Sequence, residues 1–178
     1  TLFDNFGRKQ FIDVAEGRLS LDDFMEQLSD DDLIHLLGGQ PNVGVSNTFG
    51  FGNLPDYGVP SIMTADGPAG LRISGECSMN TTAWPCATLL ACTWNPALVQ
   101  QVGQAGAEEV KENNLAVWLT PAVNIHRNPL CGRNFEYYSE DPLIAGKMGA
   151  AMVKGIQSQH IAASVKHFAA NNKETNRK

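Results

Sequence analysis

The stretch at residues 162–167 most constrains what this chain can fold into. Ala162, Ala163 and Val165 form a short apolar run that leads directly into Lys166 and His167. An apolar strand ending in charged residues is typical of the carboxyl edge of a parallel sheet, where barrels and doubly wound sheets carry their functional groups. A strand that merely reaches the surface would look the same, so this pair alone leaves both interpretations open.

Predicted helices and strands alternate along the chain. Helices are expected where a capping residue precedes apolar positions at helical spacing, at residues 20–28, 29–37, 95–112 and 141–156. Apolar runs predict strands at residues 59–64, 88–92, 115–119 and 162–165. This order indicates an α/β fold with parallel strands.

The number of strands is too small for a complete barrel. An eightfold barrel typically needs about 250 residues, and the chain has 178. We therefore predict a partial (β/α)8 barrel of the TIM type, roughly its first half, over residues 20–178, with residues 1–19 as a lead-in or interdomain connector. A half barrel has an open strand edge, so we expect the isolated piece to associate or to be unstable.

Two loop regions carry polar groups beside predicted strands. Residues 38–58 are rich in glycine and show no sustained periodicity, which predicts one long loop of a kind that is usually functional. Asp66 follows the strand at 59–64 and opens a turn with Gly67 and Gly70. This aspartate could serve a ligand site, or it could only cap the turn.

The second loop, residues 122–141, is dense in side chains of the kinds that bind ligands. It contains His126, Arg127, Arg133, Asn134, Glu136, Tyr137, Tyr138, Glu140 and Asp141. Solubility alone does not explain such density after a strand end. The sequence therefore predicts a functional loop here.

Composition excludes several classes of protein. The net charge of −6 provides no basic surface for nucleic acid, and no run approaches the roughly 18 apolar residues of a membrane span.

The histidines lack the spacing of a metal motif, so neither a metal nor a cofactor is expected. Cys77, Cys86, Cys92 and Cys131 lack metal spacing too, and free thiols are favoured, although an even number permits disulfides. Without a leader at Thr1 a cytoplasmic location is expected, and secretion would require a leader already removed.

Three motifs together resemble glycoside hydrolase family 3. They are TADGPAGLR, GRNFEYYSEDP and KHFAANNKETNR, in this order, and the resemblance covers about residues 20–178. Lys166-His167-Phe168 is followed by two alanines and two asparagines, which is similar to the β-glucosidase branch. The N-acetylhexosaminidase branch has a catalytic histidine that finds no counterpart here.

The resemblance implies a role for each matching residue. Asp66 would accept hydrogen bonds from sugar hydroxyls, and Arg133, Lys166 and His167 would contact hydroxyls of the same ring. Arg72 and Glu136 would support or border this subsite, and Arg177 would orient neighbouring carboxylates. Sugars present many hydroxyls, which suits clustered charged donors and acceptors, because charge-assisted hydrogen bonds are roughly twice as strong as neutral ones.

The catalytic carboxylates of the family have no match in these 178 residues. The resemblance implies that the nucleophilic aspartate and the acid/base glutamate follow later, so we expect this piece to be inactive alone. The predicted function is that of part of a retaining, exo-acting β-glucosidase, whose partners are a glycoside and the remainder of the parent chain. A non-catalytic carbohydrate-binding protein is the alternative. An oxidoreductase is disfavoured, because Gly50-Phe51-Gly52 does not continue into a dinucleotide-binding fingerprint.

Overall fold

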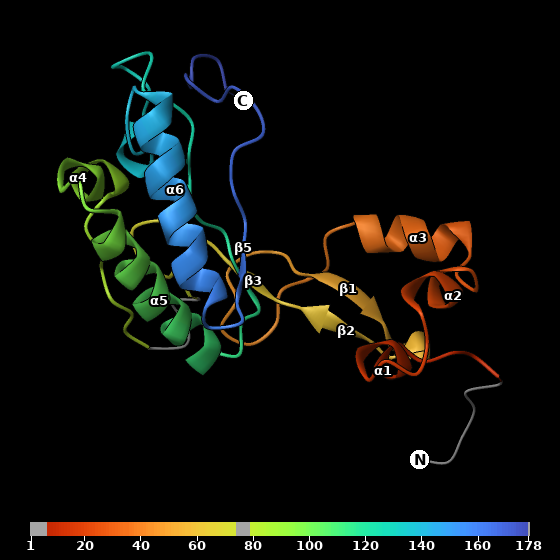
Figure 1. Cartoon of the computed structure of the whole chain (residues 1–178). Coiled ribbons are helices and arrows are strands. Elements are labelled where there is room, and N and C mark those ends of the chain that lie inside the picture. The colour runs from red at the N-terminus through yellow and green to blue at the C-terminus, as the bar shows by residue number, and fades with distance from the viewer. Residues whose placement is uncertain (1–6, 74–78, 178) are drawn as a thin grey trace. The chain divides into compact units, whose positions relative to one another are not determined.

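The computed structural model describes residues 7–73 and 79–177. The chain divides into two compact units. One contains residues up to 42 together with 49–63, and the other contains residues 43–48 and those from 64 onward. The predicted boundary between residues 19 and 20 stays a prediction, and each unit is described by itself (Figure 1).

The first unit combines three short helices with a two-stranded hairpin. Its elements are α1 (Phe11–Ala15), α2 (Leu21–Met25), α3 (Asp30–Leu37), β1 (Phe51–Leu54), the 3-10 helix η1 (Pro55–Tyr57) and β2 (Val59–Ile62). Ser29 begins α3 with a complete capping box, in which its hydroxyl accepts from the Asp32 N–H. Ser20 caps α2 in the same way through the Asp23 N–H. The predicted helix starts are thus confirmed, because the short hydroxyl side chains satisfy N–H groups that have no partner inside the helix.

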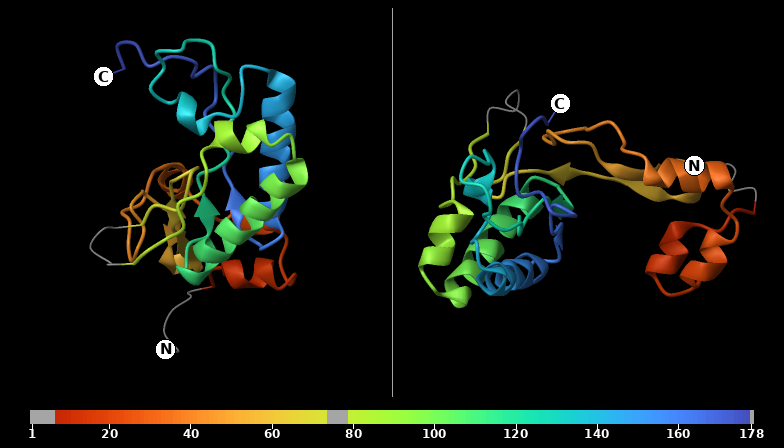
Figure 2. Two further views of the ribbon diagram at one scale, coloured as in Figure 1. Left: turned by 90° about the vertical axis from the view of Figure 1, so that its left-hand side faces the viewer. Right: turned by 90° about the horizontal axis from the view of Figure 1, so that it is seen from above.

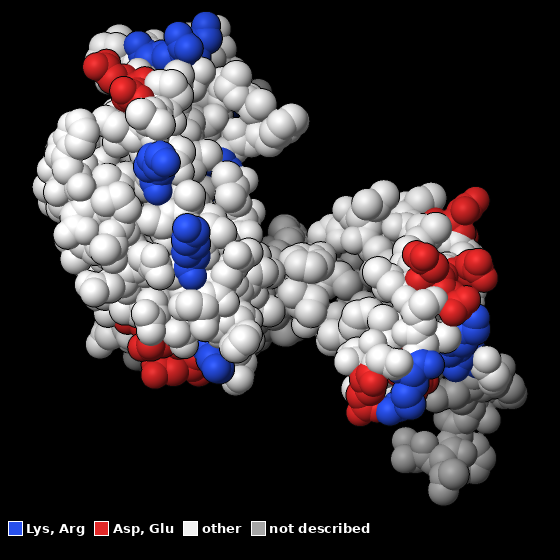
Figure 3. Space-filling view, viewed as in Figure 1, with Lys and Arg blue, Asp and Glu red and all other residues white. Residues whose placement is uncertain are grey.

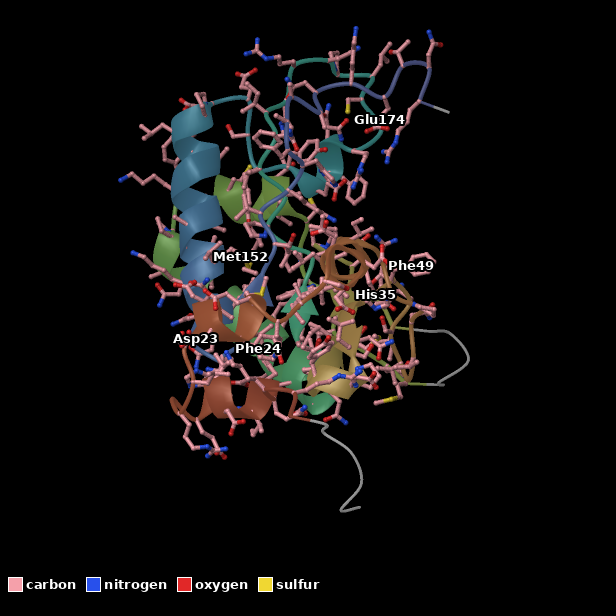
Figure 4. The ribbon with its side chains drawn as sticks, turned by 90° about the vertical axis from the view of Figure 1, so that its right-hand side faces the viewer. Asp23, Phe24, His35, Phe49, Met152 and Glu174 are labelled. Carbon is pink, nitrogen blue, oxygen red and sulfur yellow. The ribbon has the colours of Figure 1, made fainter. Side chains whose placement is uncertain are left out.

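A small apolar core holds the first unit together. Phe24 on α2, marked in Figure 4, is 2% exposed and packs with Leu28 and Leu54. The rings of Phe11 and Phe24 meet edge to face, with centroids 5.5 Å apart. Leu21 and Met25 remain exposed, so the apolar face expected for this helix is only half buried.

The prediction of one loop over residues 38–58 was wrong. Strand β1 lies inside this range and pairs with β2 in antiparallel register, Phe51 opposite Ile62 and Leu54 opposite Val59. The predicted strand at 59–64 is also divided, because β2 ends at Ile62 and a separate strand begins at Thr64. The expectation of parallel strands throughout therefore fails for this hairpin.

The second unit contains the parallel sheet that the sequence predicts. Its strands are β3 (Thr64–Ala65), β4 (Val117–Trp118) and β5 (Ala162–Ala163), in the order β3-β4-β5. Thr64 lies opposite Val117, and Val117 lies opposite Ala162, both in parallel register. The sheet is open among the described residues, with β3 and β5 at its edges, and no closed barrel is seen.

Two long helices cover one face of this sheet (Figures 1 and 2). They are α5 (Pro96–Glu112), capped by the side chain of Asn95, and α6 (Pro142–Gln157), capped by that of Asp141. They pack against each other through buried stripes that include Val99, Val102 and Met152. The structure confirms both predicted helices. Each has a capping side chain, a proline in its first turn and an apolar stripe at helical spacing, which explains why these segments are helical.

The prediction of a strand at Thr88–Cys92 was wrong, because this segment forms the helix α4 (Ala87–Cys92). Its buried residues are Ala87, Leu90 and Ala91, which follow the spacing of a helix face. Periodicity alone cannot distinguish a short buried helix from a buried strand, since every position of such a run is apolar.

Charged side chains of both signs are spread over the face shown in Figure 3. This agrees with the modest net charge of −6. No helix within residues 7–73 and 79–177 has the length and apolar character needed to cross a membrane.

Candidate functional site

The three parallel strands bring distant polar residues to one edge of the sheet. Asp66 follows β3, the loop with Arg133 and Glu136 lies beyond β4, and Lys166 follows β5. The pairing continues past the strands, because the Lys166 N–H donates to the Pro121 carbonyl at 3.0 Å and the Val123 N–H donates to the Lys166 carbonyl at 2.8 Å. All seven predicted site residues lie in the second unit.

The turn after β3 fixes the backbone of Asp66. The Arg72 N–H donates to the Asp66 carbonyl at 2.9 Å, and the indole Nε1 of buried Trp118 donates to the Gly67 carbonyl at 3.1 Å. Gly67 has φ +112°, and a Cβ there would collide with the Gly70 carbonyl. The turn therefore requires glycine at position 67, and Trp118 anchors it to the centre of the sheet.

The Asp66 carboxylate lies between two cations. Its Oδ1 accepts from Lys166 Nζ at 2.6 Å and its Oδ2 from Arg72 Nη2 at 2.7 Å. Partial burial opposes ionisation, but the hydrogen bonds from Lys166 and the Gly67 N–H, with the charges of Lys166 and Arg72, outweigh it and lower the pKa of Asp66. Asp66 is thus an ionised acceptor at neutral pH.

Glu136 lies behind this pair and is only 3% exposed. Its Oε1 accepts from Arg133 Nε, and its Oε2 lies 3.7 Å from Lys166 Nζ. Both oxygens therefore face cations of the site. The predicted support role agrees with this burial, because so enclosed a carboxylate presents little surface to a ligand.

Arg133 connects Glu136 to His167. Its Nη2 lies 2.7 Å from His167 Nε2. Desolvation lowers the pKa of His167 first, and the nearby charges of Arg133 and Lys166 lower it further. Desolvation of Arg133 is outweighed by its hydrogen bond to Glu136, which raises the pKa of the guanidinium. His167 is therefore a neutral side chain beside a permanent cation.

Four further residues support His167 and Arg177: the sequence indicates Tyr137 only as part of the predicted functional loop, and it gives no role to Asn124, Asn171 or Glu174. The Asn124 amide accepts from the His167 N–H at 2.7 Å and donates to the His167 carbonyl at 3.1 Å. Tyr137 Oη lies 3.1 Å from His167 Nδ1 and 2.8 Å from Asn171 Nδ2. Glu174, labelled in Figure 4, accepts from Asn171 and from Arg177 Nη1. Asn171 and Glu174 lie inside the third motif, so only that motif could have indicated them.

These contacts form one continuous chain of ten side chains, here called the polar chain. In order, its members are Arg72, Asp66, Lys166, Glu136, Arg133, His167, Tyr137, Asn171, Glu174 and Arg177. It includes every residue for which the sequence predicted a sugar-binding or supporting role. The structure brings all seven together, while their roles stay predictions.

A cavity of about 580 Å³ opens beside the polar chain. Its walls are Asp66, Gly67, Pro68, Ala69, Gly70, Arg72, Arg133, Phe135, Glu136 and Arg177. Lys166 and His167 line a smaller neighbouring cavity of about 240 Å³. Ionised donors and acceptors with one exposed aromatic side chain suit a ligand that has many hydroxyls and some C–H surface.

The described residues contain no group of three or more histidine, cysteine, aspartate or glutamate side chains placed to hold a metal ion. His126 lies in the predicted functional loop, but its Nε2 contacts the Asn134 and Tyr137 carbonyls at 2.9 and 3.0 Å, which gives it a structural role. Cys86, Cys92 and Cys131 are free thiols. Cys77 lies outside the described residues.

Comparison with known proteins identifies the family. Residues 53–177 match the family described as "Glycosyl hydrolase family 3 N terminal domain". The chain therefore belongs to glycosyl hydrolase family 3, as its three motifs predict.

Individual relatives are β-glucosidases and related glycosidases. Beta-glucosidase A of Butyrivibrio fibrisolvens is 66% identical over 96% of this chain and 20% of its own length. An exo-alpha-(1->6)-L-arabinopyranosidase of Bifidobacterium longum is 50% identical over 67% of this chain and 17% of its own length. The structure of beta-glucosidase 3B from Thermotoga neapolitana in complex with α-D-glucose superposes with a TM-score of 0.81 at 45% identity, covering 89% of this chain and 24% of that one. The chain thus spans about a fifth of the length of the relatives it matches.

Proposed function

We propose that this chain supplies the sugar-binding part of a retaining, exo-acting β-glucosidase that removes terminal β-linked glucose or a related sugar. The observation that supports it best is the cavity beside the polar chain, where Asp66 offers an ionised acceptor and Arg133 a charged donor. The glucose complex of a relative 45% identical to this chain supports glucose as the sugar.

The two carboxylates of this cavity are poor candidates for the chemical step. A retaining glycosidase uses one carboxylate as nucleophile and a second carboxyl as acid/base, about 5 Å apart. Asp66 is bound by Lys166 and Arg72, and Glu136 is buried against Arg133 and Lys166. We therefore propose that both catalytic carboxylates come from another part of the parent polypeptide, and that this piece alone is inactive.

The first experiment uses the full-length polypeptide that contains this chain. Hydrolysis of an aryl β-glucopyranoside is followed by proton NMR, and the anomer of the first glucose released is recorded. We expect the β anomer, because a retaining mechanism displaces the anomeric centre twice. Initial release of the α anomer would rule out a retaining β-glucosidase.

A second measurement tests the isolated piece, residues 1–178. We expect it to hydrolyse the aryl glucoside no faster than its own Lys166→Ala variant, because neither carries a free carboxylate pair. Hydrolysis by the unsubstituted piece above this control would show that the catalytic groups lie within it.

A carbohydrate-binding protein without catalysis is the second candidate. The cavity supports it equally, since hydroxyl recognition by Asp66 and Arg133 needs no reacting carboxylate. Glucose binding by the full-length polypeptide, without hydrolysis of aryl β-glucosides, β-xylosides or α-L-arabinopyranosides, would favour it. Hydrolysis of the arabinopyranoside alone would support a glycosidase whose sugar is arabinose and not glucose.

A further inference from the structure

The hydrogen-bond chemistry of Arg133 determines which nitrogen of His167 carries a proton. A guanidinium only donates hydrogen bonds, and it stays charged in proteins. Arg133 Nη2 lies 2.7 Å from His167 Nε2, so Nε2 must accept. A neutral imidazole carries one proton, which therefore lies on Nδ1.

Within residues 7–73 and 79–177, the proton on Nδ1 has one acceptor within reach. Tyr137 Oη lies 3.1 Å away, and the two rings are edge to face with centroids 6.0 Å apart. Tyr137 is fully buried and directly follows the 3-10 turn Asn134–Glu136. The hydroxyl is thus fixed as the acceptor of the imidazole proton.

Asn171 fixes the other side of the tyrosine hydroxyl. Its Nδ2 lies 3.1 Å from Glu174 Oε1, and a carboxylate only accepts, so the amide must present its NH₂ group there. The second N–H of that group points to Tyr137 Oη at 2.8 Å. The hydroxyl therefore receives hydrogen bonds from both Asn171 and His167.

The hydrogen bonds among Tyr137, His167 and Arg133 orient the Arg133 guanidinium. Its Nε is bound to Glu136 and its Nη2 to His167, while Nη1 makes no hydrogen bond to the described residues. Arg133 also lines the cavity of about 580 Å³. Two anchored nitrogens fix the plane of the guanidinium, so the Nη1 donors have a defined direction.

We propose that Tyr137 is a positioning residue: Arg133 requires the Nδ1-protonated neutral form of His167, and the Tyr137 hydroxyl stabilises that form by accepting the Nδ1 proton, which helps to hold Nε2 against Arg133. Asn171 assists by holding the hydroxyl in place. The consequence for sugar binding rests on the proposed function of the site. The protonation state itself does not, because it follows from contacts within the chain.

The test uses the full-length polypeptide labelled with ¹⁵N-histidine. The His167 signals are assigned by their loss in His167→Gln. We expect Nδ1 to show the shift of a protonated nitrogen and Nε2 that of an unprotonated one. In Tyr137→Phe, which removes only the hydroxyl, the Nδ1 proton loses its acceptor and Arg133 alone favours this tautomer, so we expect both shifts to move part of the way toward the average of the two tautomers.

Tyr138→Phe is the matched control, because it removes the hydroxyl of the adjacent buried tyrosine outside the polar chain. It is expected to leave the His167 signals in place. Asn171→Ala gives a second route if Tyr137→Phe does not fold, and should move the signals in the same direction by less. With a substrate, Tyr137→Phe should lower kcat/KM about tenfold, mostly through KM, as the loss of one oriented hydrogen bond predicts.

Two results would overturn the proposal. One is a protonated Nε2 in the unsubstituted protein. The other is His167 signals in Tyr137→Phe and Asn171→Ala that match those of Tyr138→Phe. If the ¹⁵N shifts behave as expected but no glycoside is hydrolysed, the positioning role of Tyr137 stands and the proposed function fails.

Discussion

Lys166 Nζ lies 2.6 Å from Asp66 Oδ1, although the two residues are 100 positions apart in the chain. Their side chains are 13% and 24% exposed, so water screens the pair only in part. The contact exists because β3 and β5 flank β4 and end at the same edge of the sheet. Two of the three family motifs meet at this ion pair.

Lys166→Ala should weaken both the site and the fold. It removes the shared cation between Asp66 and Glu136, and for the proposed hydrolysis of an aryl β-glucoside by the full-length polypeptide we expect kcat/KM to fall about 100-fold, roughly 3 kcal/mol. Loss of a partly exposed pair should reduce the free energy of unfolding by about 1–2 kcal/mol. Kinetics and denaturant unfolding measure the two effects. Lys154→Ala, an exposed lysine of α6, is the control, and equal effects of both variants would contradict the role of Lys166.

Glu136→Gln removes the negative charge of Glu136 while keeping the size and shape of the side chain, so it tests the contribution of the charge. The amide keeps one acceptor oxygen, but its NH₂ group must face either Arg133 or Lys166, both of which only donate. We expect a loss of about 1–3 kcal/mol in the free energy of unfolding and a raised KM. The matched control is Glu108→Gln on the exposed side of α5. Unchanged stability of Glu136→Gln would show that its carboxylate charge is not needed.

The Asp66 carboxyl should make stability depend on pH in acid. In the folded protein the pKa of Asp66 lies below its ordinary value of 3.8, so folding favours the ionised carboxylate. This contribution is fully present above the unfolded pKa and is lost as the pH falls through the folded value. We therefore expect the difference in Tm between the unsubstituted protein and Asp66→Asn to be greatest above about pH 5 and to shrink below it. A difference that does not vary with pH would argue against the ion pair.

Two glycine substitutions should act in opposite directions. Gly67→Ala places a Cβ against the Gly70 carbonyl at φ +112°, so we expect a loss of about 1–3 kcal/mol. Gly146 lies within α6, and a Cβ there meets no atom within 4 Å. Gly146→Ala should therefore stabilise the protein by about 0.5–1 kcal/mol, because alanine loses less entropy in a helix. Thermal unfolding compares the two, and a stabilising Gly67→Ala would show that the turn can rearrange.

Local signals predicted the long helices well and the short elements poorly. Helices α5 and α6 combine a capping side chain, a proline and an apolar stripe, and each signal is local to the helix. The segment Ala87–Cys92 lacks a capping side chain, and its hydrophobic run fits a strand equally well. Strand β1 was missed because its Gly52 and Asn53 disfavour strands, and only pairing with β2 supports it.

The candidate site was predictable where polar residues follow strands or match a motif. Asp66, Lys166 and His167 follow strand ends, and Arg133 and Glu136 lie in a loop dense with charges. Trp118 contacts Gly67, which lies 51 positions away in the sequence. Asn124 and Tyr137 contact His167, which lies 43 and 30 positions away from them. No periodicity reports such contacts, since they depend on which strand ends become neighbours.

The separation between Asp66 and Lys166 also sets the order in which the site can form during synthesis. Asp66 leaves the ribosome 100 residues before Lys166 does. At elongation rates of about 5–20 residues per second, this delay is roughly 5–20 s. During that time Arg72 is the cation nearest in sequence to the aspartate, and β5 cannot yet join the sheet. The nascent chain therefore carries Asp66 without its lysine partner until the third motif has emerged, so the ion pair at this edge of the sheet cannot form before then.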